Sequence, residues 1–166
     1  MTEDFGEFKP KKKYSLPEAL AKIYRYCAYQ ERSHQEVKNK LYEYGLHSSE
    51  VEETISRLIS EGFLNEERFA KAFAGGKFRI MKWGKHKIER ELQAQGLTKK
   101  CISIGLKEVD DSDYRKTLKA LIRKKSELIH EENTFKKKDK VARYVIGKGY
   151  EPELVWEMVK NYFGNS

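Results

Sequence analysis

The sequence has little proline, little cysteine and no long apolar run. Its 166 residues include 3 Pro and 2 Cys. Sparse proline with abundant Lys, Glu, Leu and Ala favours helix over strand at almost every position. Cys27 and Cys101 stand far apart, without the clustered spacing of a disulfide framework or a zinc site. We therefore expect two buried thiols in a reducing compartment.

The sequence also lacks the features of membrane and secreted proteins. No apolar run approaches the roughly 18 residues that span a bilayer. The amino terminus, Met1 to Asp4, is acidic where a signal peptide needs a basic stretch. The length is too short for a two-domain dinucleotide-binding enzyme or a (β/α)8 barrel. We expect a soluble, cytoplasmic protein with no membrane partner.

What the sequence does contain is an internal repeat. Gly45, Gly96 and Gly149 are each followed by an apolar residue. Matching apolar residues flank each glycine: Val37, Leu41, Val51 and Ile55, then Ile88, Leu92, Ile102 and Leu106, then Val141, Val145, Val155 and Val159. Each glycine fits the left-handed end of one helix, and a second amphipathic helix follows.

A further helical stretch precedes each pair of helices, at about 16–30, 66–81 and 113–130. The sequence therefore predicts an all-α fold of three tandem three-helix repeats, stacked into an elongated, curved array. The predicted parts are a flexible basic tail at 1–14 and repeats at 15–63, 64–110 and 111–163. Helix starts are expected at the capping boxes Ser15/Glu18, Ser33/Glu36 and Ser49/Glu52, and at the first-turn proline Pro152.

The formal charge of +8 is unevenly distributed. Residues 1–62 carry a net charge of −1, residues 63–109 carry +6 and residues 110–166 carry +3. The excess of positive charge is concentrated in residues 71–90, which contain seven basic residues and a single acidic residue, Glu89. The candidates for contact with a nucleic acid or an acidic partner are Lys71, Lys77, Arg79, Lys82, Trp83, Lys85, Lys87 and Arg90. The alternative is a solvated face, with Phe78 and Trp83 in the core.

A second basic cluster flanks the turn around Glu131 and Glu132. It consists of Arg123, Lys124, Lys125, Lys136, Lys137 and Lys138. We interpret these residues as solvated helix ends.

Signatures of catalysis are absent from the sequence. Gly76-Lys77 is followed by Phe78 where a phosphate-binding loop needs Ser or Thr. The four histidines are scattered without metal-ligand spacing. We predict no catalytic residue, no metal and no cofactor, and hence no enzyme.

One stretch is similar to a known family. Residues 62–97 have the sequence GFLNEERFAKAFAGGKFRIMKWGKHKIERELQAQGL. The segment upstream contains Arg32-Ser33, Leu41 and Gly45 at the spacing of the first repeat of that family. Together with the repeat count, these motifs resemble the RecX family of bacterial recombination regulators over nearly everything after residue 15. The chain departs from the family pattern at Asn65-Glu66, which replaces an acidic pair, and at Ala74-Gly75-Gly76. Two adjacent glycines weaken a helix, which leaves a kink or local fraying open at this point.

The resemblance implies a protein that acts in DNA recombination, repair and the SOS response. It implies binding to the RecA filament on DNA, along its helical groove, and restraint of its ATPase, strand-exchange and coprotease activities. Weak, non-specific contact with single- or double-stranded DNA and a monomeric state are also expected. Two other functions stay open. One is a helix-turn-helix DNA-binding regulator, suggested by the order of helix, glycine turn and helix from Ser33 to Gly62, and the other is a helical protein adaptor. Against the first, the second helix of that pair carries Glu50, Glu52 and Glu53 with only Arg57 basic.

Overall fold

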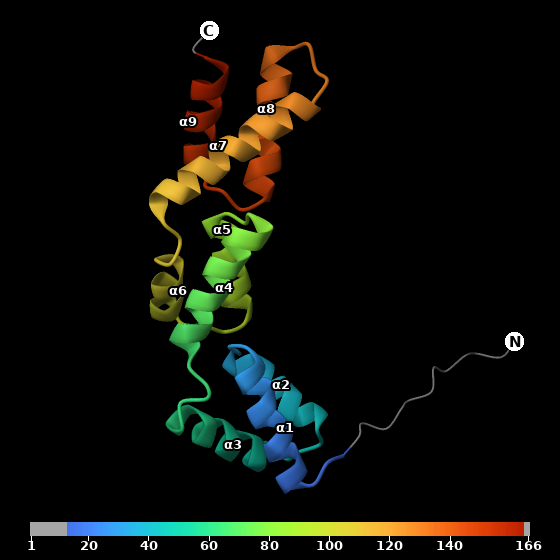
Figure 1. Cartoon of the computed structure of the whole chain (residues 1–166). Coiled ribbons are helices and arrows are strands. Elements are labelled where there is room, and N and C mark those ends of the chain that lie inside the picture. The colour runs from blue at the N-terminus through green and yellow to red at the C-terminus, as the bar shows by residue number, and fades with distance from the viewer. Residues whose placement is uncertain (1–12, 165–166) are drawn as a thin grey trace, which may run out of the picture. The chain divides into compact units, whose positions relative to one another are not determined.

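The computed structural model describes residues 13–164, and all regular secondary structure in this range is helical (Figure 1). The helices are α1 (Leu16–Tyr29), α2 (His34–Glu43), α3 (Ser48–Ser60), α4 (Glu66–Met81), α5 (Lys85–Ala94), α6 (Lys99–Leu106), α7 (Asp111–Leu128), α8 (Thr134–Gly147) and α9 (Pro152–Phe163). The predicted all-α fold is confirmed over the described residues. None of these helices combines the length and the apolar character needed to cross a membrane.

Most of the predicted basic tail, residues 1–12, lies outside the described residues. Tyr14, the last residue of the predicted tail, is bound to the first repeat. Its backbone N–H donates to the carbonyl oxygen of Tyr44 at 3.0 Å, and the two rings meet edge to face.

The chain divides into two compact units after Glu66. The first unit contains α1, α2 and α3, and its core is formed by the apolar stripes that the repeat predicts. Its fully buried side chains include Ala19, Ile23, Val37, Leu41, Val51 and Leu58. Cys27 is buried in the same cluster, and Ile55 is only half-buried at its edge.

The second unit contains α4 to α9, so repeats two and three share one core. Phe78, Ile88 and Leu118 are buried there, which places Phe78 in the core. Helices α4 and α6 approach closely at Gly105, where a Cβ would lie 2.7 Å from the backbone oxygen of Ala70. Only glycine fits this crossing.

The three repeat glycines have the predicted conformation. Gly45, Gly96 and Gly149 have φ of +92°, +80° and +104°. After each of them the next N–H donates to the carbonyl oxygen five residues earlier, as in Leu97 to Leu92 at 3.2 Å. These bonds satisfy carbonyls at the helix end that would otherwise lack a donor. The repeat read from the sequence is therefore a repeat of backbone geometry.

The predicted helix starts are confirmed at three positions and wrong at one. Ser15 forms the full capping box with Glu18, Ser33 accepts the N–H of Glu36 at 3.1 Å, and Pro152 opens α9. Ser49 does not cap α3, because that helix already begins at Ser48 with His47 as the N-cap residue. The Glu50 carboxylate accepts the backbone N–H of His47 at 3.1 Å. Here a neighbouring acidic residue at the right spacing displaced the predicted pair by two residues.

The Gly75-Gly76 pair does not interrupt the helix, since α4 runs from Glu66 to Met81. Gly75 is buried, and a Cβ there would lie 2.7 Å from a guanidinium nitrogen of Arg79. The missing side chain lets Arg79 fold back along its own helix. Packing against the second-unit core compensates for the low helix propensity of the glycines.

Repeats two and three are joined at two turns. The N–H of Gly84, between α4 and α5, donates to the Lys148 carbonyl at 2.8 Å, and the N–H of His86 donates to the Gly149 carbonyl at 2.9 Å. The buried Tyr150 hydroxyl donates to the carbonyl of Lys82 at 3.0 Å. Trp83 directly precedes Gly84, so its indole lies beside this joint.

Candidate protein and nucleic-acid contact surfaces

Trp83 lies between two lysines at the end of the α4–α5 turn. The Nζ atoms of Lys77 and Lys87 lie 4.9 Å and 4.5 Å from the centroid of its ring. One edge of the indole packs on Phe73, with ring centroids 6.3 Å apart. The indole is half-buried, so it both closes the second-unit core and supports two cations at the surface.

Of three other predicted candidates, Arg79 is exposed on α4 with its guanidinium beside Gly75, and Lys82 and Lys85 contact the fold directly. Lys82 adopts φ +59°, and its Nζ donates to the carbonyl of Arg79 at 2.9 Å, which caps the end of α4. The Nζ of Lys85 lies 3.5 Å from Asp111 Oδ1 and 4.7 Å from the ring centroid of Tyr114. A partner that binds Lys85 must compete with Asp111 for it.

The last two candidates lie apart from these. Lys71 is exposed on α4. Arg90 is exposed on α5 and lines an open depression of about 390 Å³ with Ile146, Tyr150 and Pro152. The structure thus groups Lys77, Trp83 and Lys87, and distributes the other predicted residues around the joint.

The second basic cluster occupies helix ends. Arg123 and Lys124 are exposed near the end of α7, and Lys136 is exposed in the first turn of α8. The Nζ of Lys125 lies 4.3 Å from the ring centroid of Tyr144. The remaining members, Lys137 and Lys138, are half-buried on α8.

Sequence analysis missed a surface hollow on the first unit. Its six lining residues, which we call the tyrosine hollow, are Lys22, Arg25, Tyr26, Tyr29, Arg32 and Tyr44. The hollow is open, with a volume of about 370 Å³. The signal was present in the spacing, because Lys22, Arg25, Tyr26 and Tyr29 follow the i, i+3, i+4, i+7 pattern of one helix face. The net charge of −1 over residues 1–62 concealed it.

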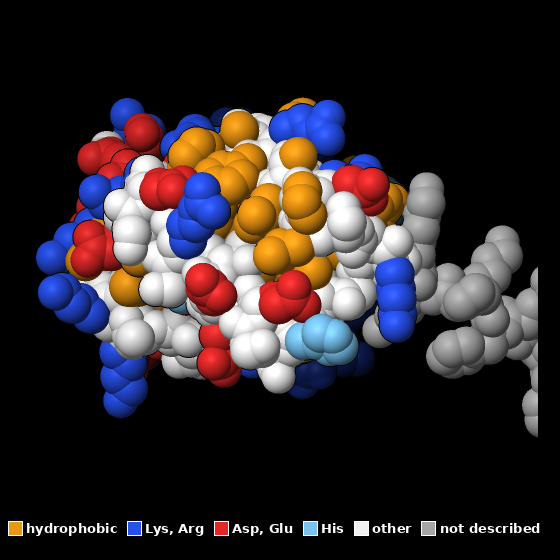
Figure 2. Space-filling model, turned by 90° about the horizontal axis from the view of Figure 1, so that it is seen from below, with side chains coloured by type: hydrophobic (Ala, Val, Ile, Leu, Met, Phe, Trp, Pro, Cys, Tyr) orange, Lys and Arg blue, Asp and Glu red, His pale blue; other side chains and the backbone are white. Residues whose placement is uncertain are grey.

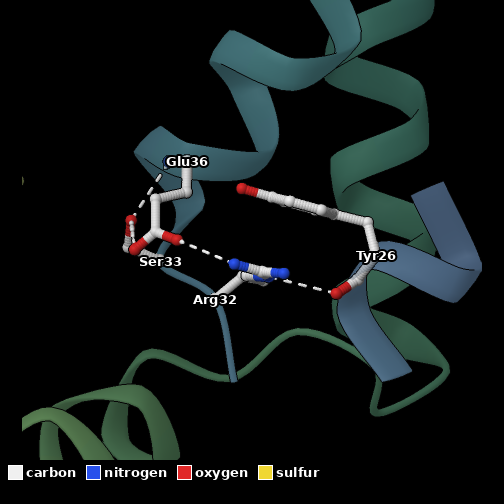
Figure 3. Close-up of polar contacts among 4 residues, drawn as sticks. All are labelled: Tyr26, Arg32, Ser33 and Glu36. Carbon is white, nitrogen blue, oxygen red and sulfur yellow. Dashed lines mark hydrogen bonds and ion pairs between the residues drawn. The ribbon is translucent and has the colours of Figure 1, made fainter. Parts of the chain in front are cut away.

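Arg32 is held rigidly at this hollow (Figure 3). Its guanidinium carbon lies 3.7 Å from the ring centroid of Tyr26, and its Nε donates to the Tyr26 carbonyl at 3.0 Å. A terminal nitrogen lies 3.7 Å from Glu36 Oε2, and only 13% of the Arg32 side chain is exposed. Burial is the main cause that raises the pKa of Tyr26 above its ordinary value.

The first unit also presents an apolar surface. Figure 2 shows hydrophobic side chains gathered on one face. On α1 and α3 and just after them, Leu16, Ile59 and Phe63 are 41%, 45% and 39% exposed. The Phe63 ring packs edge to face on Tyr24, with ring centroids 4.8 Å apart. We call these four residues the α1–α3 apolar surface.

Within residues 13–164 no three His, Cys, Asp or Glu side chains come together as a metal site would require. His34 lies on α2, His47 precedes α3, His86 lies on α5 and His130 lies between α7 and α8.

Three family models match the chain in succession. They describe the first, second and third three-helix domains of RecX and match residues 19–58, 65–106 and 112–159. The chain belongs to the RecX family. The resemblance in the sequence motifs is thereby confirmed, together with the three-repeat organisation.

Relatives in the RecX family include proteins named Regulatory protein RecX. The one from Clostridium beijerinckii is 30% identical over 131 residues, covering 78% of this chain and 61% of the relative. The one from Bacillus cereus is 23% identical over 140 residues, covering 84% and 52%. The chain thus spans about three fifths of the length of the first of these relatives and half of the second.

Solved RecX structures share the fold. The crystal structure of RecX from Lactobacillus salivarius aligns with a TM-score of 0.78 at 18% identity, covering 88% of this chain and 95% of that one. Another crystal structure of regulatory protein RecX aligns with a TM-score of 0.79 at 20% identity, covering 88% and 71%.

Proposed function

We propose that this chain is a cytoplasmic, non-enzymatic regulator that binds the RecA filament on DNA and mainly inhibits its recombinase, ATPase and coprotease activities. The observation that carries the proposal is the succession of three RecX domain matches over residues 19–159. The relatives that match are named regulatory proteins. The surface chemistry fits a partner made of both protein and nucleic acid.

Two surfaces suit the protein component of such a filament. The α1–α3 apolar surface offers exposed aliphatic and aromatic groups, which gain free energy when a partner removes them from water. The group of Lys77, Trp83 and Lys87 offers two cations held on an aromatic ring. This combination of an aromatic anchor with basic neighbours is typical of energetically important interface residues.

A helix-turn-helix DNA-binding function has less support. Helix α3 would have to enter the major groove, yet it presents exposed Glu52, Glu53 and Ile59. Carboxylates repel phosphates, and an exposed isoleucine favours a protein partner.

The deciding experiment measures the rate of ATP hydrolysis by RecA on single-stranded DNA, with and without the protein. We expect the rate to fall as the protein is titrated. Binding of the protein to RecA-coated strand, bare strand and bare duplex is compared in parallel. An unchanged ATPase rate with no preference for the coated strand would overturn the proposal. Preference for one duplex sequence would favour the helix-turn-helix DNA-binding regulator.

The contact residues are tested with charge reversals. The double variant Lys85→Glu/Lys87→Glu is expected to bind the filament more weakly, with a reduced dependence on salt. Because Lys85 is paired with Asp111, the variant Lys71→Glu/Arg90→Glu, which changes only exposed residues, is measured beside it. Wild-type affinity in both well-folded variants would exclude the residue 71–90 cluster from the interface.

A further inference from the structure

We propose that the tyrosine hollow of the first unit is a binding site for single-stranded nucleic acid. In this site Tyr29 and Tyr26 stack on bases, while Lys22 and Arg25 contact the phosphates. The proposal concerns direct binding of bare strand and does not rest on the RecA function. It also assigns nucleic-acid contact to a unit whose sequence carries a net charge of −1 over residues 1–62.

The charge of the hollow is the first argument. Its lining consists of three basic residues and three tyrosines, with no carboxylate. Two nearby carboxylates are paired with basic side chains: Glu36 lies 3.7 Å from Arg32, and Glu43 lies 3.6 Å from Lys40. Lys22 and Arg25 therefore add positive charge that no lining residue offsets. A polyanion gains from this arrangement through release of its counterions.

The aromatic rings are the second argument. Tyr29 is 83% exposed at the last residue of α1, so the faces of its ring are accessible from solvent. Tyr44 also lines the hollow, and its ring packs edge to face with that of Tyr14, with ring planes at 88°. Exposed rings beside basic side chains are the usual way in which proteins bind unpaired bases.

The rigidity of Arg32 is the third argument. Its guanidinium stacks on Tyr26 and is tied to the Tyr26 carbonyl and to Glu36, as Figure 3 shows. The planar guanidinium and the ring form one preformed platform, so little conformational entropy is lost when a base or phosphate binds.

These features favour a single strand over other polyanions. Bases in a duplex are already stacked and paired, so they cannot lie on Tyr29 without being extruded. An acidic peptide would use Lys22 and Arg25 but would gain nothing from stacking on Tyr29 and Tyr26. The volume of about 370 Å³ is within the range of pockets that admit small planar ligands.

The test uses the full chain without any recombinase. A fluorescein-labelled oligo(dT) of about 20 nucleotides is titrated by anisotropy, a length that covers more than one site on typical single-strand binders. We expect Tyr29→Ala to weaken binding about tenfold and Lys22→Glu/Arg25→Glu to weaken it more and flatten the salt dependence. The replaced side chains are exposed or half-buried, so we expect both variants to fold, and circular dichroism checks this.

Matched controls are available in the same unit. Tyr42→Ala removes a tyrosine from α2, and Lys38→Glu removes a basic residue from the same helix. Both positions lie outside the hollow, and both variants are expected to bind oligo(dT) with unchanged affinity. Equal losses in the hollow variants and these controls would overturn the proposal, as would wild-type affinity in the hollow variants.

A second measurement locates the strand. Photocrosslinking with oligonucleotides that contain 5-iodouracil, followed by mass spectrometry, is expected to modify Tyr29 or Tyr26. Crosslinks confined to Trp83 would place the strand on the second unit and overturn the assignment. A polyglutamate peptide is titrated in parallel. Binding of that peptide with loss in Lys22→Glu/Arg25→Glu, but no binding of oligo(dT), would assign the hollow to an acidic protein instead.

Discussion

Gly84 and Gly149 lie with their backbones in direct contact at the joint between repeats two and three. A Cβ on Gly84 would stand 2.2 Å from the carbonyl carbon of Gly149, and a Cβ on Gly149 would stand 2.7 Å from the backbone nitrogen of Lys87. Neither neighbour is the movable end of a side chain. The joint therefore requires glycine on both sides.

The first prediction follows from this contact. Gly84→Ala is expected to lower the free energy of unfolding by about 2 kcal/mol or more, because overpacking forces the two turns apart. Urea denaturation measures the change. Gly76→Ala is the control, since a Cβ at Gly76 meets nothing within 4 Å and the residue lies inside α4. That variant should gain about 1 kcal/mol in helix propensity, and equal destabilisation of both variants would contradict the prediction.

The second prediction concerns Tyr114, which lies at the same joint. Its hydroxyl accepts the N–H of Lys85 at 3.0 Å and donates to the Glu151 carboxylate. Burial, followed by the hydrogen bond to Glu151, raises the pKa of Tyr114. Removing the hydroxyl in Tyr114→Phe is expected to cost about 1–3 kcal/mol, because two partners lose their bond.

The pH dependence follows from the sign of this shift. Above pH 10, the ordinary tyrosine pKa, unfolded Tyr114 loses its proton while the folded protein keeps it. The unfolded state then binds fewer protons, so stability falls as the pH rises beyond about 10. Tyr114→Phe should flatten this fall in urea titrations between about pH 9 and 11. Tyr162→Phe, at a more exposed ring, serves as the control, and parallel slopes for Tyr114→Phe and wild type would contradict the argument.

The third prediction tests the corrected start of α3. Ser33→Ala removes a buried hydroxyl that caps α2 and should cost about 1–2 kcal/mol. Ser49→Ala changes an exposed residue inside the first turn of α3 and should leave stability within about 0.5 kcal/mol of wild type. Thermal unfolding followed by circular dichroism distinguishes the two. A cost at Ser49 as large as at Ser33 would restore the capping box first expected there.

The fourth prediction concerns the ion pair of Lys85. Lys85→Glu places a carboxylate beside Asp111 and is expected to lower stability by about 1 kcal/mol, since surface pairs contribute little. Adding Asp111→Asn should recover part of that loss. Arg90→Glu, at an exposed position, should change stability by less than about 0.5 kcal/mol. If the second substitution recovers nothing, the pair does not stabilise the fold.

The fifth prediction concerns the thiols. Burial raises the pKa of Cys27 to about 11, so very little thiolate is present at pH 8. Cys101 is only half-buried. Iodoacetamide at pH 8 should therefore modify Cys101 well before Cys27, with mass spectrometry reporting each site, and denaturant should remove the difference. Faster modification of Cys27 in the folded protein would contradict its burial.

Much of the fold could be predicted from local patterns. The spacing of Val37, Leu41 and their equivalents defines the buried face of each helix, and the glycines mark where each first helix of a pair ends. These are short-range properties, since helix periodicity and left-handed backbone depend on neighbouring residues. The start of α3 also has a local cause, because Glu50 lies three residues after His47. The continuity of α4 through Gly75 has a tertiary cause, because core packing compensates for the glycines.

The contact surfaces depended on distant residues, and here the sequence was less informative. The basic residues of 71–90 form one continuous cluster in the sequence. In the structure Lys85 pairs with Asp111, whereas Lys77 and Lys87 both contact the ring of Trp83. No local rule could assign those partners, because they come from different helices. Charge summed along the chain also hid the tyrosine hollow, since the acidic residues of that unit lie outside its lining.

By itself, then, the sequence determined three repeats of three helices, the residues of their cores and membership in the RecX family. Tertiary structure alone decided which surface groups act together. Arg32 lies on Tyr26, six residues away, only because the turn between α1 and α2 brings it back over the ring. Periodicity orients a side chain relative to its own helix, whereas packing between helices determines which other side chains it meets.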